Sequence, residues 1–215
     1  MYSLTTAENI YRAVLDGIKK ESTAVLTPEA FNRLINGYAL TEWLVDKAGD
    51  ADKDQPVIDA LRNLYHFTEP LAVNRSYEVD LPDNYYRLQA VLFHLGGKDT
   101  PGLPAKRMKP DSLSVMAVNP HRTPNDKRIY YFQMGNKIIN KPRNKNVSHA
   151  TLFYLSRPNP IIYNIREEFQ QHGNLLIEQN KEVVDICVRI FLERVKEERY
   201  QSILTEEAIK NQKSI

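Results

Sequence analysis

The sequence predicts an α+β fold: N-terminal helices, a central, mostly antiparallel β-sheet with a hairpin, and a long C-terminal amphipathic helix. Three observations support this prediction. Apolar residues recur at helical spacing in residues 1–70, alternation replaces it in residues 71–160, and helical spacing returns in residues 161–215. We expect these regions to form one compact domain with a projecting last helix, because 215 residues can bury one good core.

The first region carries helix start signals. Thr5 and Glu8 have the spacing of a capping box, and the apolar face that follows comprises Ile10, Val14 and Ile18. A second helix should begin at Thr27, with Pro28 at its first position. Its stripe passes Gly37 and comprises Phe31, Leu34, Ile35, Tyr38 and Val45. A shorter third helix after Pro56 would carry Ile58, Leu61 and Tyr65.

The middle of the chain has the composition of strands. The segment SYEVDL alternates, and β-rich runs lie at about 86–95, 113–118, 129–133, 137–140 and 150–156, although 86–95 would also suit a helix. The clearest hairpin is IYYFQMGNKIIN, whose turn, Met134-Gly135-Asn136, needs positive φ. The strand ATLFYLS should end before Pro158 and Pro160.

The last region predicts one long helix from about Asn174, or two helices joined near Ser202, since no Gly or Pro follows Gly173. Its apolar stripe could dock on a neighbouring subunit or fold back on its own sheet. The candidate docking residues are Val183, Val184, Cys187, Ile190, Phe191 and Val195.

Composition excludes several classes of protein. A single cysteine, Cys187, excludes an internal disulfide framework and a Cys-rich zinc module. The N-terminal segment lacks the apolar core of a signal peptide, and no apolar run approaches the ~20 residues that span a bilayer. We expect a soluble protein, made in a reducing compartment, with no membrane partner.

The motifs of catalysis are missing from the sequence. HLGGKDT imitates a phosphate-binding loop, but Leu92 replaces its first glycine and Asp99 follows Lys98, so a flexible turn is the simpler interpretation. Cys187 lies on an apolar stripe, which favours a buried thiol over a nucleophile. The histidines lack metal-binding spacing; they are His66, His94, His121, His149 and His172. We predict a non-enzymatic protein with no catalytic residue, cofactor or metal.

Charge is distributed unevenly along the chain. Residues 101–150 contain ten Lys/Arg against two Asp/Glu, a net +8, whereas residues 1–100 carry −5 and residues 151–215 carry −1. Three interpretations stay open: a solvated hairpin, contact with an acidic protein surface, or sequence-blind contact with DNA phosphates. The candidate contact residues are Arg122, Lys127, Arg128, Lys137, Lys141, Arg143 and Lys145.

The order of several motifs resembles a known family. LINGYALTEWL, DLPDNYYRL, NPHRTPNDKRIYYF, GNKIIN, TLFYLSRPNPI and FLERVKEERYQS follow one another along nearly the whole chain. Together they resemble the head-to-tail connector ring (adaptor) proteins of tailed bacteriophages, and most of all those of crAss-like phages. The resemblance rests on the order of these motifs along the chain.

The resemblance implies a structural virion protein. Such subunits form a homo-oligomeric ring, commonly of twelve, beneath the portal protein, contact adjacent tail or ring proteins, and extend the channel through which genomic DNA passes without sequence specificity. It implies synthesis in the host cytoplasm, a place in the neck of the virion, and no catalytic residues. The first alternative is a sequence-independent nucleic-acid-binding module, and the second is an enzyme with a dispersed site. A ring visible by electron microscopy would separate the connector from both.

Overall fold

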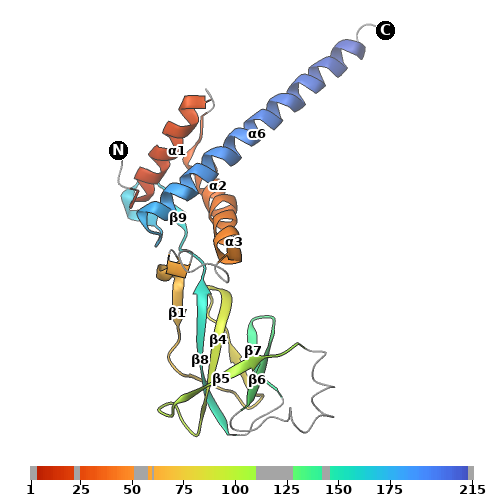
Figure 1. The fold of residues 1–215 in the computed structure, drawn as a ribbon. Coiled ribbons are helices and arrows are strands. Elements are labelled where there is room, and N and C mark those ends of the chain that lie inside the picture. Colours follow the sequence, from red (N-terminus) through yellow and green to blue (C-terminus); the bar gives the residue numbers. More distant parts are fainter. Residues whose placement is uncertain are drawn as a thin grey trace. The chain divides into compact units, whose positions relative to one another are not determined.

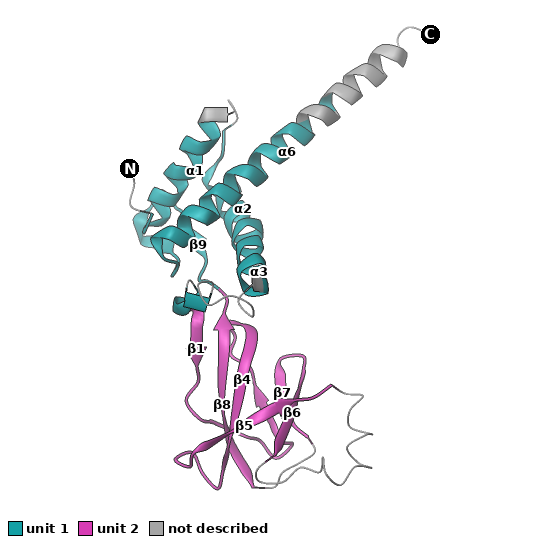
Figure 2. Cartoon of the chain, in the orientation of Figure 1, with its two compact units in different colours: residues 1–63, 158–215 teal, residues 64–157 magenta. Residues whose placement is uncertain are grey.

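The computed structural model describes residues 4–21, 25–50, 58–59, 61–109, 128–141 and 146–212. Contacts divide the chain into two compact units: unit 1 (residues 1–63 and 158–215) and unit 2 (residues 64–157) (Figure 2). The α+β prediction is confirmed, with helices, a mostly antiparallel sheet and a long C-terminal helix. The first and last regions, which the sequence presents as separate, belong to the same unit. None of the helices in the described residues is long and apolar enough to cross a membrane.

Unit 1 is built mainly from helices (Figure 1). Its elements are α1 (Ala7–Glu21), α2 (Pro28–Leu34), the π-helical turn η1 (Ile35–Ala39), α3 (Leu40–Asp50), the short strands β9 (Ile161–Ile162) and β10 (Gln171–His172), the 3₁₀ turn η4 (Glu167–Phe169) between them, and α6 (Ile177–Gln212). The 3₁₀ turn η2 (Arg62–Leu64) lies where unit 1 passes into unit 2.

The first helix begins one residue later than the capping-box pattern predicts. The hydroxyl of Thr6, not that of Thr5, accepts a hydrogen bond from the backbone N–H of Asn9 (3.2 Å), which makes Thr6 the N-cap. The predicted apolar face is correct, because all three of its residues are fully buried: Ile10, Val14 and Ile18.

A π-helical turn changes the face of the second helix. Thr27 caps α2 as predicted, and its hydroxyl accepts from Ala30 N (3.3 Å). In η1 the N–H of Leu40 bonds to the carbonyl of Ile35, five residues back, which inserts one extra residue into the turn. The extra residue rotates the apolar stripe about the helix axis for the residues that follow. Tyr38 (46% exposed) and Val45 (52% exposed), both predicted as core, therefore face outward, and the residues buried beyond the turn are Ala39, Leu40, Trp43, Leu44 and Ala48.

The predicted third helix is largely wrong. Ile58 and Asp59 are helical, but the chain then forms η2, and Tyr65 begins strand β1 (Tyr65–Phe67). Tyr65 pairs with Leu155 in the sheet of unit 2, so sheet hydrogen bonding overrides a weak helical spacing here.

The C-terminal helix is one continuous element of 36 residues, about 54 Å at 1.5 Å per residue. It starts at Ile177 rather than near Asn174 and continues without a break at Ser202. Its first half packs against α1, η1 and α3. The indole N–H of Trp43 donates to Glu182 (2.6 Å), and Arg189 forms an ion pair with Glu42.

Over its described residues, unit 2 forms an eight-stranded sheet with the order β1-β8-β4-β5-β6-β7-β3, and β2 pairs with β8 beside β1. The pairings between these strands are antiparallel except that of β5 with β6. Besides β1, its strands are β2 (Leu71–Ala72), β3 (Glu78–Asp80), β4 (Tyr85–Leu95), β5 (Gly102–Arg107), β6 (Ile129–Met134), β7 (Lys137–Asn140) and β8 (Val147–Ser156).

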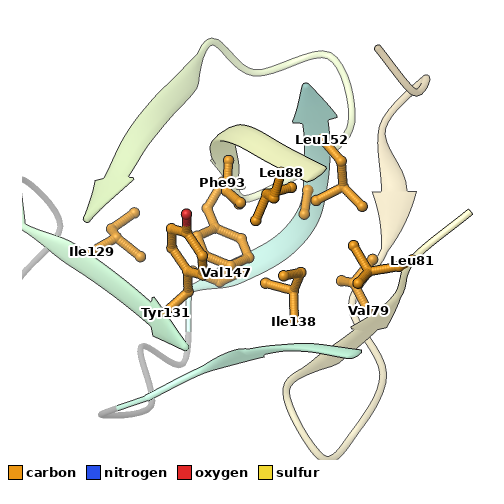
Figure 3. Packing of buried hydrophobic residues seen from close by; sticks show 11 residues of the cluster. Val79, Leu81, Leu88, Phe93, Ile129, Tyr131, Ile138, Val147 and Leu152 are labelled. Atoms are coloured by element: carbon orange, nitrogen blue, oxygen red, sulfur yellow. The ribbon is translucent and has the colours of Figure 1, made fainter. Parts of the chain in front are cut away.

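The sheet curls because a short turn joins strands at its two ends. Five residues, 73–77, connect β2 to β3, a span of at most about 20 Å. Asn74 holds this turn: its side-chain oxygen accepts from the N–H groups of Ser76 and Glu78 (both 2.9 Å), and its own N–H donates to Glu78 O (3.1 Å). The buried side chains of β3, β4, β6, β7 and β8, and that of Leu81 just after β3, form one cluster inside the curl (Figure 3). They include Val79, Leu88, Phe93, Tyr131, Ile138 and Leu152.

The predicted strand pattern is mostly correct. The ambiguous run 86–95 is strand β4, the hairpin β6–β7 turns at Gly135 with φ of 58°, and β8 ends before Pro158. Strand β5 was not predicted, because Gly102 and Pro104 are poor strand formers. The predicted strand at 113–118 lies outside the described residues.

Candidate interaction surfaces

The basic hairpin is less basic than its sequence suggests. Lys137 forms an ion pair with Glu78 across β7 and β3 (2.9 Å). The hydrogen bond with Lys137 lowers the pKa of Glu78, and the same bond raises the pKa of Lys137. Lys141 lies over the ring of Phe132, 5.7 Å from its centroid. Lys137 is therefore already partnered and is a weaker candidate for phosphate contact than predicted.

A different basic cluster lies on β5 and at the start of β6. Lys106, Arg107 and Lys109 are exposed, and Arg128, also exposed, precedes Ile129, which pairs with Ala105. Sequence reasoning missed Lys106 and Arg107 at the end of β5 and Lys109 just after it, although they contribute to the +8 charge of their segment. Of the predicted contact residues, the structure places Arg128, Lys137 and Lys141; the others lie outside the described residues: Arg122, Lys127, Arg143 and Lys145.

The predicted docking face of α6 is partly core. Val183, Val184 and Cys187 are buried inside unit 1, which favours packing within the chain over docking on another subunit for this part of the stripe. The cause is that α1, η1 and α3 already cover this part of the helix. Burial also raises the pKa of the Cys187 thiol to about 12.

Farther along α6, burial declines. The other predicted docking residues are half-buried: Ile190, Phe191 and Val195. Leu192 is the last buried residue among those of α6 whose side chains the structure describes, and charged side chains dominate from Glu193 to Glu198. Arg194 lies 4.1 Å above the ring centroid of the exposed Tyr38. The helix thus changes from a core element to a surface element near Leu192.

An open groove of about 1230 Å³ runs between α1 and α6. The two helices, which lie side by side in Figure 1, approach closely where Gly17 faces Val188: a Cβ on Gly17 would lie 2.7 Å from Val188 Cγ2. The apolar lining includes Leu4, Ala13, Ile177, Val184, Val188 and Leu192. Charged residues on its margin include Asp16, Lys181, Asp185 and Lys196.

Unit 1 also carries a rigidly held loop between β9 and β10. Asn32 donates to the carbonyl of Tyr163 (2.9 Å) and accepts from its N–H (2.8 Å). Asn36, one turn later, makes the same two bonds with Ile161 (2.7 and 2.8 Å). The two amides thus take the place of a neighbouring strand and satisfy both backbone groups of two residues.

Aromatic and terminal contacts complete the support of this loop. Tyr11 stacks on Tyr163 with centroids 4.4 Å apart, and its hydroxyl donates to Leu26 O (2.8 Å). The N–H of Ala7, at the start of α1, donates to His172 Nδ1 (3.1 Å). These bonds connect both ends of the loop to the helices.

The tip of the loop, residues 165–169, exposes two large apolar side chains. Ile165 is 82% exposed and Phe169 is 56% exposed. Arg166, Glu167 and Glu168 lie between them and are also exposed. Sequence reasoning missed this apolar tip. The available signal was an Ile and a Phe among charges after two prolines, a segment without a periodic pattern.

His94 and the glycine turn that follows it have structural roles. His94 is buried, with Nδ1 2.6 Å from Thr100 O and Nε2 2.9 Å from the hydroxyl of Thr151. The glycine turn after it leads into strand β5, whereas a phosphate-binding loop leads into a helix N-terminus. Among the described residues, which omit His121, His, Cys, Asp and Glu form no group of three that could hold a metal ion.

Comparison with known proteins adds no family. No protein-family model matches the chain, and no curated protein matches it.

Proposed function

We propose that this protein is a structural subunit of a phage head-to-tail connector, in which copies form a ring beneath the portal protein and extend the DNA channel toward the tail. The resemblance of its motif order to connector ring proteins motivates the proposal. The observation that carries it is the division of α6, whose first part is core up to Leu192 and whose residues 193–198 are exposed or half-buried.

The stretch of α6 around Leu192 needs a partner for its half-buried apolar side chains. Isolated helices are marginally stable in water and gain most of their stability from packing. Ile190 and Phe191 just precede the last buried residue, Leu192, and Val195 just follows it; all three are half-buried. In a connector, that stretch would pack on a neighbouring subunit, the portal protein, or an adjacent tail or ring protein.

The test is the assembly state of the purified full-length chain. We expect negative-stain images and mass photometry to show closed rings of one size, either alone or after addition of the portal protein. A protein that stays at its monomer mass of 24.9 kDa in both conditions would overturn the proposal.

The second candidate function is sequence-independent nucleic-acid binding, favoured by the exposed cluster of Lys106, Arg107, Lys109 and Arg128. The two functions are compatible if this cluster lines the channel. Phosphate contact predicts that the logarithm of the binding constant falls with the logarithm of salt concentration, with a slope of about −0.9 per phosphate neutralised. Replacing Lys106 and Arg107 by Gln should reduce that slope, whereas Lys137→Gln should change it little, because Lys137 is paired with Glu78.

A further inference from the structure

We propose that the apolar tip of one copy inserts into the α1–α6 groove of a neighbouring copy, at the end of the groove marked by Ile177. This inference rests on the proposed ring and names the contact that would build it. Both surfaces belong to unit 1, so a single folded unit carries the two halves of the contact.

The apolar tip has the properties of an interface anchor. Ile165 and Phe169 expose large apolar surfaces, which cost free energy in water unless a partner covers them. The loop that presents them is held by four hydrogen bonds from Asn32 and Asn36 and by the stacked ring of Tyr11. A loop ordered before binding loses little conformational entropy when it binds.

The groove is large enough to receive such a tip. Its volume of about 1230 Å³ exceeds the roughly 300–1,000 Å³ typical of small-molecule sites. Ile177 on its margin is 48% exposed and would gain a hydrophobic partner. A small ligand would leave much of this open space unfilled, whereas a protein loop would fill it.

Both surfaces carry charges of each sign: the tip has Arg166, Glu167 and Glu168, and the groove is lined by Asp16, Glu178, Asp185 and Glu193 and by Lys181, Arg189 and Lys196. Individual pairs of opposite charge favour a second copy as the occupant. The tip carries Glu167 and Glu168, and the groove carries Lys181, one helical turn from Ile177. Within the described residues these three side chains make no ion pair. Arg166 on the tip likewise matches Asp185 on the groove margin.

A contact between two different surfaces has a consequence for assembly. Such a heterologous contact leaves every copy with one unused tip and one unused groove until the chain of copies closes on itself. Repetition of the contact therefore yields a closed ring when a whole number of copies completes one full turn.

The experiment uses three variants of the full chain. The tip variant carries Ile165→Asp and Phe169→Asp. The groove variant carries Ile177→Asp and Lys181→Glu; Ile177 is the first residue of α6, where an acidic side chain suits the helix dipole. The control is Val25→Asp, because Val25 is 84% exposed in unit 1, much like Ile165. Circular dichroism and the fluorescence of Trp43 should show all three folded.

We expect the control to form normal rings and the tip and groove variants to lose them. In these two variants the protein concentration needed for assembly should rise at least about tenfold over that of the wild type. A one-to-one mixture of the tip and groove variants should form dimers and nothing larger, because one functional contact remains per pair. Reversing the charges, with Lys181→Glu and Glu167→Lys/Glu168→Lys in one chain, should restore assembly relative to Lys181→Glu alone.

The outcomes separate the contact from the ring. Rings in the tip variant would overturn the contact and leave the connector proposal intact. If the wild-type protein forms only dimers, and both the tip variant and the groove variant are monomeric, the proposed contact stands and the ring proposal is overturned. Wild-type protein that is monomeric would overturn both.

Discussion

At the residue scale, Gly17 sets the distance between the two longest helices of unit 1. Its hydrogen lies where a methyl group would be 2.7 Å from Val188 Cγ2, so α1 and α6 pack as closely as their backbones and Val188 permit. Val188 is β-branched and stiff at χ1, so it cannot easily rotate away.

Gly17→Ala should therefore lower the free energy of unfolding by about 1–3 kcal/mol through overpacking, although alanine favours helix by about 1 kcal/mol. Urea denaturation followed by Trp43 fluorescence measures this. Gly49→Ala in α3 is the matched control, because a Cβ there meets nothing within 4 Å, and it should be neutral or stabilising. Gly17→Ala combined with Val188→Ala should recover part of the loss; equal stability of Gly17→Ala and wild type would contradict the close contact.

Cys187 supplies a second test at this scale. Its pKa, raised by burial from 9.0 to about 12, leaves about one thiolate in 10,000 thiols at pH 8. We expect a chromogenic disulfide reagent to react with it only after addition of urea. The sign of the linkage also follows: burial of the neutral thiol stabilises the fold fully below pH 9.0, and this contribution declines between pH 9.0 and about 12. Fast reaction of the native protein at pH 8 would show that α6 is not packed as described.

At the element scale, the β9–β10 loop depends on two amide side chains from a helix. Asn36→Asp keeps the oxygen that accepts from Ile161 N but replaces the donor to Ile161 O by a carboxylate oxygen. An unsatisfied carbonyl facing a negative charge should cost about 1–3 kcal/mol of stability. Thermal unfolding measures the cost, and Glu168→Ala, in the exposed part of the same loop, serves as the control. If Asn36→Asp were as stable as the control, the amides would not hold the loop.

Elements with a strong local signal could be predicted from the sequence. Thr27 with Pro28 starts a helix, and Gly135 turns a hairpin, because both signals act within a few residues. The exposure of Tyr38 could not be predicted, since nothing in INGYA distinguishes a π-helical turn from an α-helical one. Strand β5 was missed because its pairing with β4 and β6 outweighs the poor propensities of Gly102 and Pro104.

The candidate surfaces show the same limit. The +8 segment indicated cations, but the neutralisation of Lys137 depends on Glu78, 59 residues earlier in the chain. The apolar stripe of α6 indicated burial correctly, but the division of that stripe into core and surface depends on where α1 and α3 end against it. Neither partner can be located without the tertiary fold.

At the scale of the whole molecule, α6 can be divided experimentally. Removal of residues 199–215 should leave unit 1 intact, because its buried residues end at Leu192 in the described part of α6, but should abolish assembly if the second half docks on a partner. Removal of residues 174–215 deletes Val183, Val184 and Cys187 from the core of unit 1 and should abolish the cooperative unfolding of unit 1, followed by the fluorescence of Trp43, while unit 2 still melts. Calorimetry and mass photometry check both; rings formed by the shorter deletion would show that the end of α6 is dispensable for assembly.

The two ends of the chain share one unit, and this has a consequence during synthesis on the ribosome. Ile10, Val14 and Ile18 emerge first, yet α6, the helix that packs against α1, is translated more than 150 residues later. At roughly 5–20 residues per second, the apolar face of α1 waits on the order of ten to thirty seconds for its partner. Unit 2, which is continuous in sequence, can finish folding in the meantime. The nascent chain therefore exposes the apolar face of α1 until α6 has been translated, and we expect its yield to depend on chaperones that bind exposed apolar segments.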